Sequence, residues 1–267
     1  MIRRPPRSTQ GVSSAASDVY KRQKEIRTYF ASPMAYVVSA AFLAITGFFF
    51  VASVSDAFAE ASIRGYLAGA IFFMIFMSPA LTMRLLAEEQ KLGTLELLLT
   101  SPLREFEIVF GKFIAAFAMT LIMIILSLYF VLVLFVYGDP DIGPLLSGLL
   151  GLSMYACATL AVGLFASSLS SNQIVGLVVG SGILTALTII DFVSARLSGI
   201  ASEVLNAFQL GASFSVFDLD SFGVAEGGHF ADFARGIISV TDIAYYISIT
   251  AVFLLLTVLV LEARRWR

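Results

Sequence analysis

The sequence predicts an all-α integral membrane protein with six transmembrane helices. Its 267 residues are 58 % hydrophobic and only 13 % charged, and their mean hydropathy is +0.91. A soluble domain of this size cannot hide so much apolar surface, because its surface-to-volume ratio leaves too little interior. The apolar residues also gather into six long runs. A run of about 20 apolar residues can cross the hydrocarbon core of a bilayer as a helix.

Short polar stretches separate the first five runs, and a longer, half-apolar segment precedes the sixth. The second run contains Pro79 near its end, where we expect a kink. The fifth run is short and rich in glycine. The expected spans cover, in chain order, about residues 36–55, 66–86, 113–136, 145–166, 174–190 and 240–261.

Polar residues mark the start of three of these helices. Ser32-Pro33 precedes the first span, and we expect Ser171 to cap the fifth. Residues 239–242 (SVTD) form a capping box at the start of the sixth.

Two stretches precede the first span. Residues 1–23 are basic, contain Ser and Pro, and lack the apolar region of a signal peptide. They resemble the translated read-through of a sequencing-library adapter, so we exclude them from the fold; the alternative is a disordered basic tail. Residues 24–30 place apolar side chains on one helical side and basic ones on another, which predicts a short interfacial helix. The transmembrane domain is therefore expected to occupy residues 24–267.

The distribution of Lys and Arg predicts the orientation in the membrane. Six spans put both termini on one side, and cytoplasmic loops carry an excess of Lys and Arg. From Lys24 onward, nine of these residues lie on one side and three on the other, so the first side is expected to be cytoplasmic. The first set is Lys24, Arg27, Arg84, Lys91, Arg104, Lys112, Arg264, Arg265 and Arg267, and the second is Arg64, Arg196 and Arg235.

Residues 84–112 connect the second and third spans, so they leave one face of the bilayer and return to it. Gly93-Thr94 interrupts the helical pattern, and a leucine stripe follows on a short helix that Ser101-Pro102 closes. A helix of this kind either lies flat on its own membrane surface or docks into a groove on a soluble partner. The stripe consists of Leu92, Leu95, Leu98 and Leu99.

The spans carry no chemistry that would drive transport. No ionisable residue lies at the centre of a span, where ion-coupled transporters usually place acids, bases or histidines. The single histidine, His229, lies before the last span, and no Cys, His, Asp and Glu cluster has metal-ligand spacing. Gly111-Lys112 lacks the upstream glycine and the following Ser or Thr of a P-loop. We therefore expect no catalytic, cofactor or metal site in this chain, and a driving force delivered at residues 84–112.

Two runs of the sequence resemble the ABC type-2 permeases, the transmembrane subunits of ABC transporters. The first, MRLLAEEQKLGTLELLLTSPLREFEIVFGK, covers residues 83–112 and lies between the second and third spans, as in that family. The second, FARGIISVTDIAYY, covers residues 233–246 and leads into the last span. Within the family, the branch associated with gliding motility and with the copper-processing permease of denitrifiers looks nearest. The resemblance extends over about residues 24–267.

This resemblance implies a permease subunit of an ATP-driven exporter, without an ATP site of its own, in the inner (plasma) membrane of a bacterium or archaeon. ATP and Mg²⁺ would bind two separate ATP-binding subunits. The permease would form a homodimer or heterodimer surrounded by membrane lipid, with no nucleic-acid partner. ATP binding would move the coupling helix, and a two-state dimer would open a path outward. Carried over by position, the coupling region would comprise Glu88, Glu89, Gly93, Thr94, Leu95, Glu96, Leu98 and Leu99.

The family also implies two short re-entrant helices before the last span, here at about residues 205–217 and 230–237. In the second, four residues fall on one helical face, which agrees with a packed helix: Phe230, Phe233, Ala234 and Ile237. Residues 24–30 would match the family's interfacial elbow helix.

Other interpretations of the residues stay open. The chain could be a non-transporting membrane anchor or assembly component that docks a cytosolic ATPase, for example in gliding or secretion machinery. The charge-free spans disfavour a secondary transporter. Gly65-x-x-x-Gly69 and Gly176-x-x-x-Gly180 allow close helix approach, either between subunits or within the chain. The sequence does not specify a substrate, which leaves polysaccharide, lipid, peptide, drug and copper-related cargo open.

Overall fold

The computed structural model describes residues 33–55, 62–93, 105–194, 196, 199–211 and 228–265. Among these residues the regular elements are all helices, which confirms the predicted all-α class. Residues 1–23 and the expected interfacial helix at 24–30 lie outside the described part of the chain. The helices are α2 (Pro33–Val54), α3 (Arg64–Lys91), α5 (Glu105–Tyr137), α6 (Ile142–Leu169), α7 (Gln173–Ser194), α8 (Ile200–Asn206), α9 (Ala231–Ala234) and α10 (Val240–Arg265).

Six of the described helices, α2, α3, α5, α6, α7 and α10, are long and apolar enough to cross a membrane, which confirms the six expected spans. Two of them extend well past their expected ends, because α3 continues to Lys91 and α5 already begins at Glu105. With 33 residues, α5 is about 50 Å long, whereas the hydrocarbon core is about 30 Å thick. A helix satisfies its own backbone hydrogen bonds, so its charged turns can continue beyond the hydrocarbon core.

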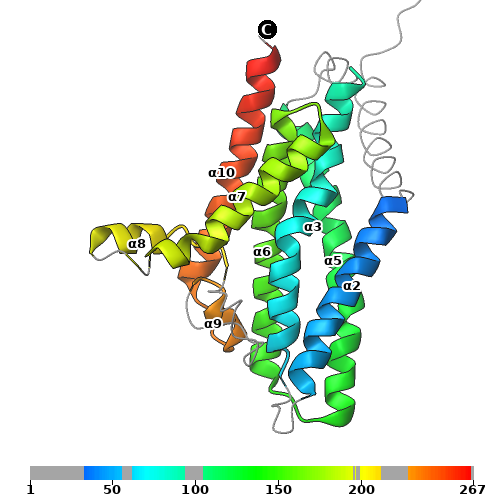
Figure 1. The fold of residues 1–267 in the computed structure, drawn as a ribbon, viewed down its shortest axis with the longest axis vertical. Coiled ribbons are helices and arrows are strands. Elements are labelled where there is room, and N and C mark those ends of the chain that lie inside the picture. Colours follow the sequence, from blue (N-terminus) through cyan, green and yellow to red (C-terminus); the bar gives the residue numbers. More distant parts are fainter. Residues whose placement is uncertain are drawn as a thin grey trace, which may run out of the picture.

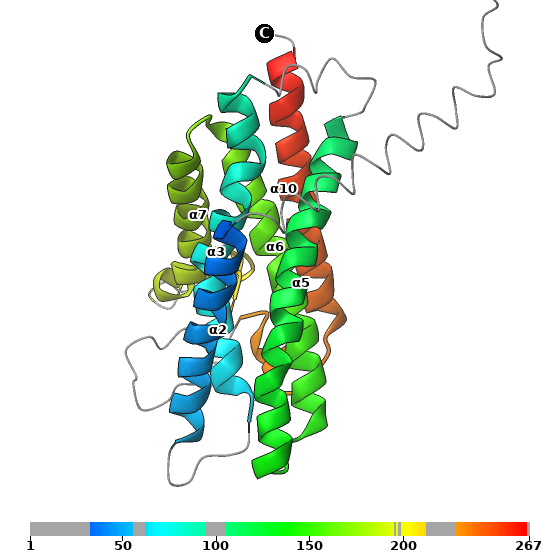
Figure 2. The same ribbon diagram turned by 90° about the vertical axis from the view of Figure 1, so that its right-hand side faces the viewer.

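Helices α3 and α6 form the centre of the bundle, and both bury most of their apolar length (Figure 1). Helix α2 packs on α3, α7 packs on both α6 and α3, and α10 follows α6. Figure 2 shows α7 and α5 on opposite sides of this central pair. We call the end where α3 finishes and α5 begins the loop end; it also holds the turn between α6 and α7 and the C-terminal end of α10. The opposite end holds the turn between α5 and α6.

Small side chains allow α3 and α6 to approach each other closely. An added Cβ at Gly163 of α6 would collide with the Thr82 hydroxyl of α3 and lie 3.1 Å from the Pro79 Cα. Nearby, the hydroxyl oxygens of Ser78 and Thr159 are 2.9 Å apart and form a hydrogen bond between the two helices. Small residues and interhelical hydrogen bonds are the usual means by which membrane helices associate.

The turn between α6 and α7 is shorter than expected. Helix α6 continues through Ser167 and Ser168, so these serines are helical and not part of the turn. The cap of α7 is Asn172 and not Ser171, because the Asn172 Oδ1 accepts a hydrogen bond from the Ile174 N–H at 3.0 Å. Asn is among the preferred capping residues, since its side-chain oxygen satisfies an otherwise unpaired N–H of the first turn.

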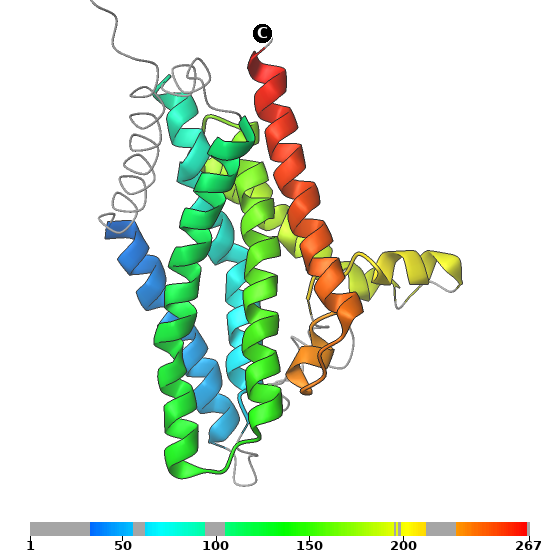
Figure 3. The same cartoon turned by 180° about the vertical axis from the view of Figure 1, so that it is seen from behind.

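Residues 228–239, which we call the α9 segment, lie beside α6 and below the start of α10 (Figure 3). Phe230 and Phe233 of this segment are fully buried. An added Cβ at Gly151 of α6 would lie 2.6 Å from the Phe233 ring, so this glycine makes room for it. The Ser147 hydroxyl donates a hydrogen bond to the Phe233 carbonyl oxygen at 2.7 Å. Helix α6 therefore holds the segment by both packing and hydrogen bonding.

The first turns of α10 hold the same segment from its other side. The Nδ1 atom of His229 lies 2.7 Å from the Oδ1 atom of Asp242. The His229 ring stacks on Tyr245, with 3.8 Å between the ring centroids. The Tyr245 hydroxyl in turn donates a hydrogen bond to the Gln209 carbonyl oxygen at 2.9 Å. The start of α10 is thus joined to the α9 segment and to the stretch that follows α8.

The two short helices expected before the last span differ from those observed. Helix α8 ends at Asn206 and residues 207–211 are not helical, while residues 212–217 lie outside the described part of the chain. Helix α9 covers only Ala231–Ala234, and Gly236 follows with φ +92°, a value that L-residues rarely adopt. Because the helix ends there, Ile237 is 53 % exposed and does not share the buried face of Phe233. Entry of the α9 segment into the bilayer stays a prediction.

Replacing Gly163 by Ala should lower the stability of the chain, because the new methyl group has no room between α3 and α6. Overpacking of this kind costs about 1–3 kcal/mol. Thermal unfolding of the detergent-solubilised chain measures the effect. Gly182→Ala is the matched control, since an added Cβ at Gly182 of α7 meets nothing within 4 Å. Equal melting temperatures for the two variants would contradict the close contact between α3 and α6.

Candidate functional site

The last turn of α3 presents part of the expected coupling region at the loop end. Glu88 is exposed on this turn, and Leu92 after it is 68 % exposed. The Leu92 N–H donates to the Glu88 carbonyl oxygen at 2.9 Å, which closes the final helical turn. Gly93 then adopts φ +69°, the left-handed conformation that commonly ends a helix and that glycine adopts without strain. The break expected at Gly93 is therefore confirmed, because α3 ends just before it.

The remaining coupling residues lie in residues 94–104, outside the described part of the chain. These residues are Thr94, Leu95, Glu96, Leu98 and Leu99. The structure instead describes the two helices that carry this stretch, α3 before it and α5 after it. The coupling role of all eight residues stays a prediction.

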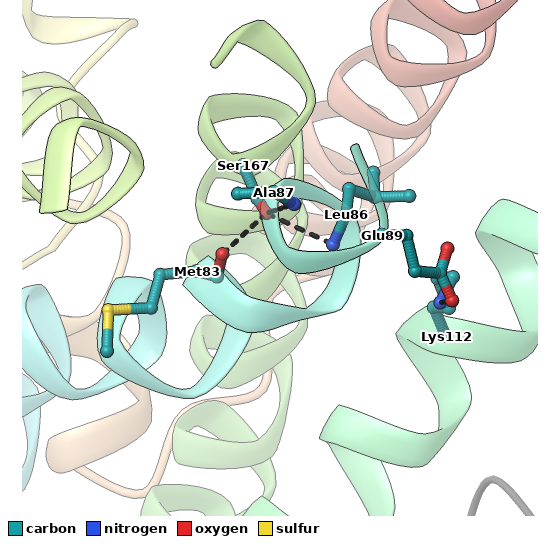
Figure 4. Close-up of polar contacts among 6 residues, drawn as sticks. All are labelled: Met83, Leu86, Ala87, Glu89, Lys112 and Ser167. Atoms are coloured by element: carbon teal, nitrogen blue, oxygen red, sulfur yellow. Dashed lines mark hydrogen bonds and ion pairs between the residues drawn. The ribbon is translucent and has the colours of Figure 1, made fainter. Parts of the chain in front are cut away.

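An ion pair joins α3 to α5 across this loop (Figure 4). The Nζ atom of Lys112 lies 2.6 Å from the Oε1 atom of Glu89. The Lys112 side chain is only 6 % exposed and the Glu89 side chain is 27 % exposed, so water screens the pair incompletely. Charge-assisted hydrogen bonds of this kind are stronger than neutral ones. The pair fixes the two helices that carry residues 94–104.

A serine of α6 joins the same part of α3 on its other side (Figure 4). The Ser167 hydroxyl donates to the Met83 carbonyl oxygen at 3.0 Å. It also accepts from the backbone N–H groups of Leu86 at 3.3 Å and Ala87 at 3.2 Å. All these atoms are buried, where an unmade hydrogen bond is costly. One hydroxyl thus sets the register of α6 against the final turns of α3.

Arg264 near the end of α10 completes the connections at the loop end. One of its Nη atoms donates to the carbonyl oxygens of Ser168 at 3.0 Å and Leu169 at 3.1 Å. The other donates to the Gln90 Oε1 atom at 3.0 Å. The Gln90 Nε2 atom itself donates to the Ser168 carbonyl oxygen at 3.0 Å. Carbonyls in the last turn of a helix have no partner within it, so Arg264 caps α6 while also holding α3.

Four residues that organise this end were not assigned to the site from the sequence: Lys112, Ser167, Gln90 and Arg264. Lys112 was visible as a charge that sets the orientation and as the end of the run 83–112, and Arg264 was visible only as a charge. Ser167 was placed in a turn because it stands in a serine-rich stretch. The contacts of Ser167 and Arg264 join residues that lie more than 70 positions apart, and such pairing leaves no signal in a single sequence.

The glycine pairs face neighbouring helices of the same chain. An added Cβ at Gly180 of α7 would lie 3.0 Å from the Pro79 Cβ, and one at Gly176 would lie 3.4 Å from the Ser167 Cα. An added Cβ at Gly69 would lie 2.8 Å from the Phe49 Cβ of α2, and Gly65 makes a similar close approach to the same helix. Each pair thus serves a helix contact within the chain. The additional assignment of Gly176 and Gly180 to a subunit contact stays a prediction.

The described residues contain no group of three or more His, Cys, Asp or Glu side chains that could hold a metal ion. Among the described residues, the loop end offers hydrogen bonds, the partly buried Glu89–Lys112 ion pair and closely packed helices. Such an arrangement fixes the relative positions of helices. It is suited to transmitting movement from one helix to another.

A sequence model described as ABC-2 family transporter protein matches residues 53–261. This match covers most of the chain, from the end of α2 to the last turns of α10. The chain belongs to the ABC-2 transporter family. No curated protein matches the sequence. The predicted family is therefore confirmed, while the branch associated with gliding motility and copper processing stays a prediction.

Membership in the ABC-2 family makes the chain a multi-pass transmembrane subunit for transport. Subunits of this family work in general with an ABC ATP-binding partner. Residues 94–104, which connect α3 to α5 in the chain, belong to the run 83–112 on which the resemblance rests.

Replacing Lys112 by Met should lower the unfolding free energy by about 1–3 kcal/mol, since Glu89 loses its cation in a partly buried place. This range is below that of a fully buried pair because Glu89 is partly solvated. The matched control is Lys91→Met, which removes an exposed Lys from the end of α3.

A double-mutant cycle with Glu89→Gln measures the pair directly. The double variant should be less destabilised than the sum of the two single variants, as expected for groups in contact. Strict additivity in thermal unfolding would show that the ion pair does not stabilise the junction of α3 and α5.

Proposed function

We propose that this ABC-2 permease is the membrane subunit of an ATP-driven exporter, and that its ATP-binding partner docks on residues 94–104. The observation that carries this proposal is the fixed geometry of the loop end. Glu89–Lys112 holds α3 to α5, Ser167 holds α3 to α6, and Arg264 adds α10. A segment that receives force must be anchored at both of its ends, and the helices on either side of 94–104 are joined to each other and to the bundle.

The leucine stripe of the loop supports docking over simple adsorption to the membrane. Both flanking helices continue several residues past the expected apolar spans before the loop begins. This length carries the ends of α3 and α5 away from the hydrocarbon core, and an apolar stripe between them would need a protein surface to cover it. Glu88 and the exposed turn around it would then face the same partner.

The orientation in this proposal follows the positive-inside rule. Nine Lys and Arg residues from Lys24 onward fall on the side of the loop end and three on the other, so the loop end and both termini are cytoplasmic. In the inner membrane of a bacterium or archaeon, soluble ATP-binding subunits lie on that cytoplasmic side. Two permease subunits and two ATP-binding subunits would form the transporter, with ATP and Mg²⁺ on the partner.

ATP binding would draw the partner subunits together and displace the loop. Because α3 and α5 are tied to each other and α3 is tied to α6, the displacement would move these helices as packed units and not one by one. Helix bundles change between discrete packings through such rigid-body shifts. A path to the opposite side of the membrane would open in one of these packings.

Replacing Glu96 by Lys together with Leu98 by Asp should abolish partner binding and ATPase stimulation, because it reverses the charge and removes the apolar ridge. The permease and its ATP-binding subunit are co-expressed and purified together from membranes. Co-purification and the ATPase rate of the reconstituted complex are then measured. We expect a loss of at least about tenfold in both, which corresponds to 1.4 kcal/mol.

The matched control is Asp139→Lys with Tyr137→Asp, a change of the same kind at exposed positions of the opposite end. This control should insert, bind and stimulate like the wild type. Normal binding and stimulation in the Glu96/Leu98 variant would show that the partner does not use residues 94–104.

A further inference from the structure

Arg264 joins α10 to α3. Its guanidinium spans two helices: one side caps the carbonyls of Ser168 and Leu169 at the end of α6, and the other binds the Gln90 side chain of α3. Gln90 stands in the last turn of α3, directly before the loop. A displacement of the loop therefore reaches Arg264 through a single side chain.

The rest of α10 at the loop end is held by apolar packing, as in the contact of the Phe253 ring with the Phe165 ring of α6, whose centroids are 5.7 Å apart. Much of this half of the helix is exposed along its side, including Val252 at 52 %, Leu255 at 57 % and Leu259 at 57 %. Its buried face there contains Leu254, Thr257 and Leu261, and α10 packs on both α6 and α5. Apolar packing is non-directional, so it allows α10 to slide on α6. The hydrogen bonds of Arg264 are directional, and they select one position of α10 relative to α3.

The far end of the same helix carries the α9 segment. Asp242 binds His229, and Tyr245 binds the Gln209 carbonyl oxygen. Between Arg264 and Asp242 the helix is continuous and about 33 Å long, at 1.5 Å per residue. A stiff helix of this length moves as one body, so a displacement of one end also displaces the other end.

We propose that Arg264 is a positioning residue that passes movement of the α3 end to α10, and through α10 to the α9 segment on the opposite side of the membrane. This inference rests on the proposed function, because the movement begins with the ATP-binding partner. It adds a second route to the one through α3 and α5. Through this route the α9 segment would also change position when ATP binds the partner subunit.

Two pairs of spin labels follow the two ends separately, in a Cys157→Ser background. The first pair, at Tyr36 and Leu92, reports on the end of α3, and the second, at Tyr137 and Val240, reports on the start of α10. These four side chains are between 63 % and 86 % exposed. The permease is reconstituted in nanodiscs with its ATP-binding subunit, with labelled chain diluted into unlabelled chain. Distances are measured without nucleotide and after trapping with ATP and vanadate.

In the wild type both distances should shift on trapping. In Arg264→Ala and in Gln90→Leu the shift at the α3 end should persist, while the population shifted at the start of α10 should fall at least about fivefold, the lower range of measured coupling factors. The two substitutions should not add, since each breaks the same link. Arg264→Lys should be intermediate, because an ammonium lacks the planar fork that reaches both helices. Glu262→Gln, an exposed change in the same turn of α10, is the control and should behave as the wild type.

A merely structural role of Arg264 would change the melting temperature and both distances together. Unchanged shifts at both ends in Arg264→Ala would overturn the inference and leave the proposed function intact. Loss of both shifts in that variant would also overturn it, because Arg264 would then act at the docking of the partner. Absence of any ATP-dependent shift in the wild type would refute the proposed function, and the inference with it.

Discussion

The close contact between α3 and α6 is the constraint on which the rest of the structure depends. Gly163 lets the two helices approach beside Pro79, and the Ser78–Thr159 hydrogen bond fixes their register in the middle of the bundle. Lipid tails are as apolar as a membrane helix, so the hydrophobic effect does little to drive helices together inside the bilayer. Packing and hydrogen bonds must supply the association. Every other spanning helix packs on at least one member of this pair.

The same pair determines what happens at the loop end. Helix α3 carries the start of residues 94–104, and its position is set by Ser167 of α6 on one side and by Lys112 of α5 on the other. Helix α6 also supports the α9 segment through Ser147 and the space left by Gly151. One central helix therefore contacts both the last turns of α3, before the expected docking loop, and the segment at the far side. This geometry suits a permease of the ABC-2 family, in which a partner subunit supplies the energy.

Much of the architecture could be predicted from the sequence, because the number of spans depends on apolar length alone. The helix break at Gly93 was also visible, since glycine readily adopts the positive φ found there. The ends of the spans were less predictable. Hydropathy shows where a helix leaves the hydrocarbon core, but α3 and α5 stay helical through their charged turns.

The contacts that position the loop needed the structure. Ser167 and Ser168 look like turn residues in a serine-rich stretch, yet α6 continues through them and uses both to bind other helices. In the sequence Arg264 is recognisable only as a positive charge, and its role as a cap appears only in the structure, where it lies beside the end of α6. The helical face predicted to join Ile237 to Phe233 was wrong, because α9 ends before a glycine with positive φ. Periodicity in a single sequence assumes that the helix continues.

Photo-crosslinking from Leu92 tests most directly whether an ATP-binding subunit engages the loop end. Leu92 is exposed at the last described turn before the loop, so a photoreactive residue placed there can reach a docked protein. Val240, exposed at the start of α10, serves as the reference position. If the partner drives the permease at the loop, Leu92 will crosslink to the ATP-binding subunit with a yield that changes on ATP trapping, and Val240 will not. Crosslinking from Leu92 to lipid alone, with or without nucleotide, would contradict force transfer at this site.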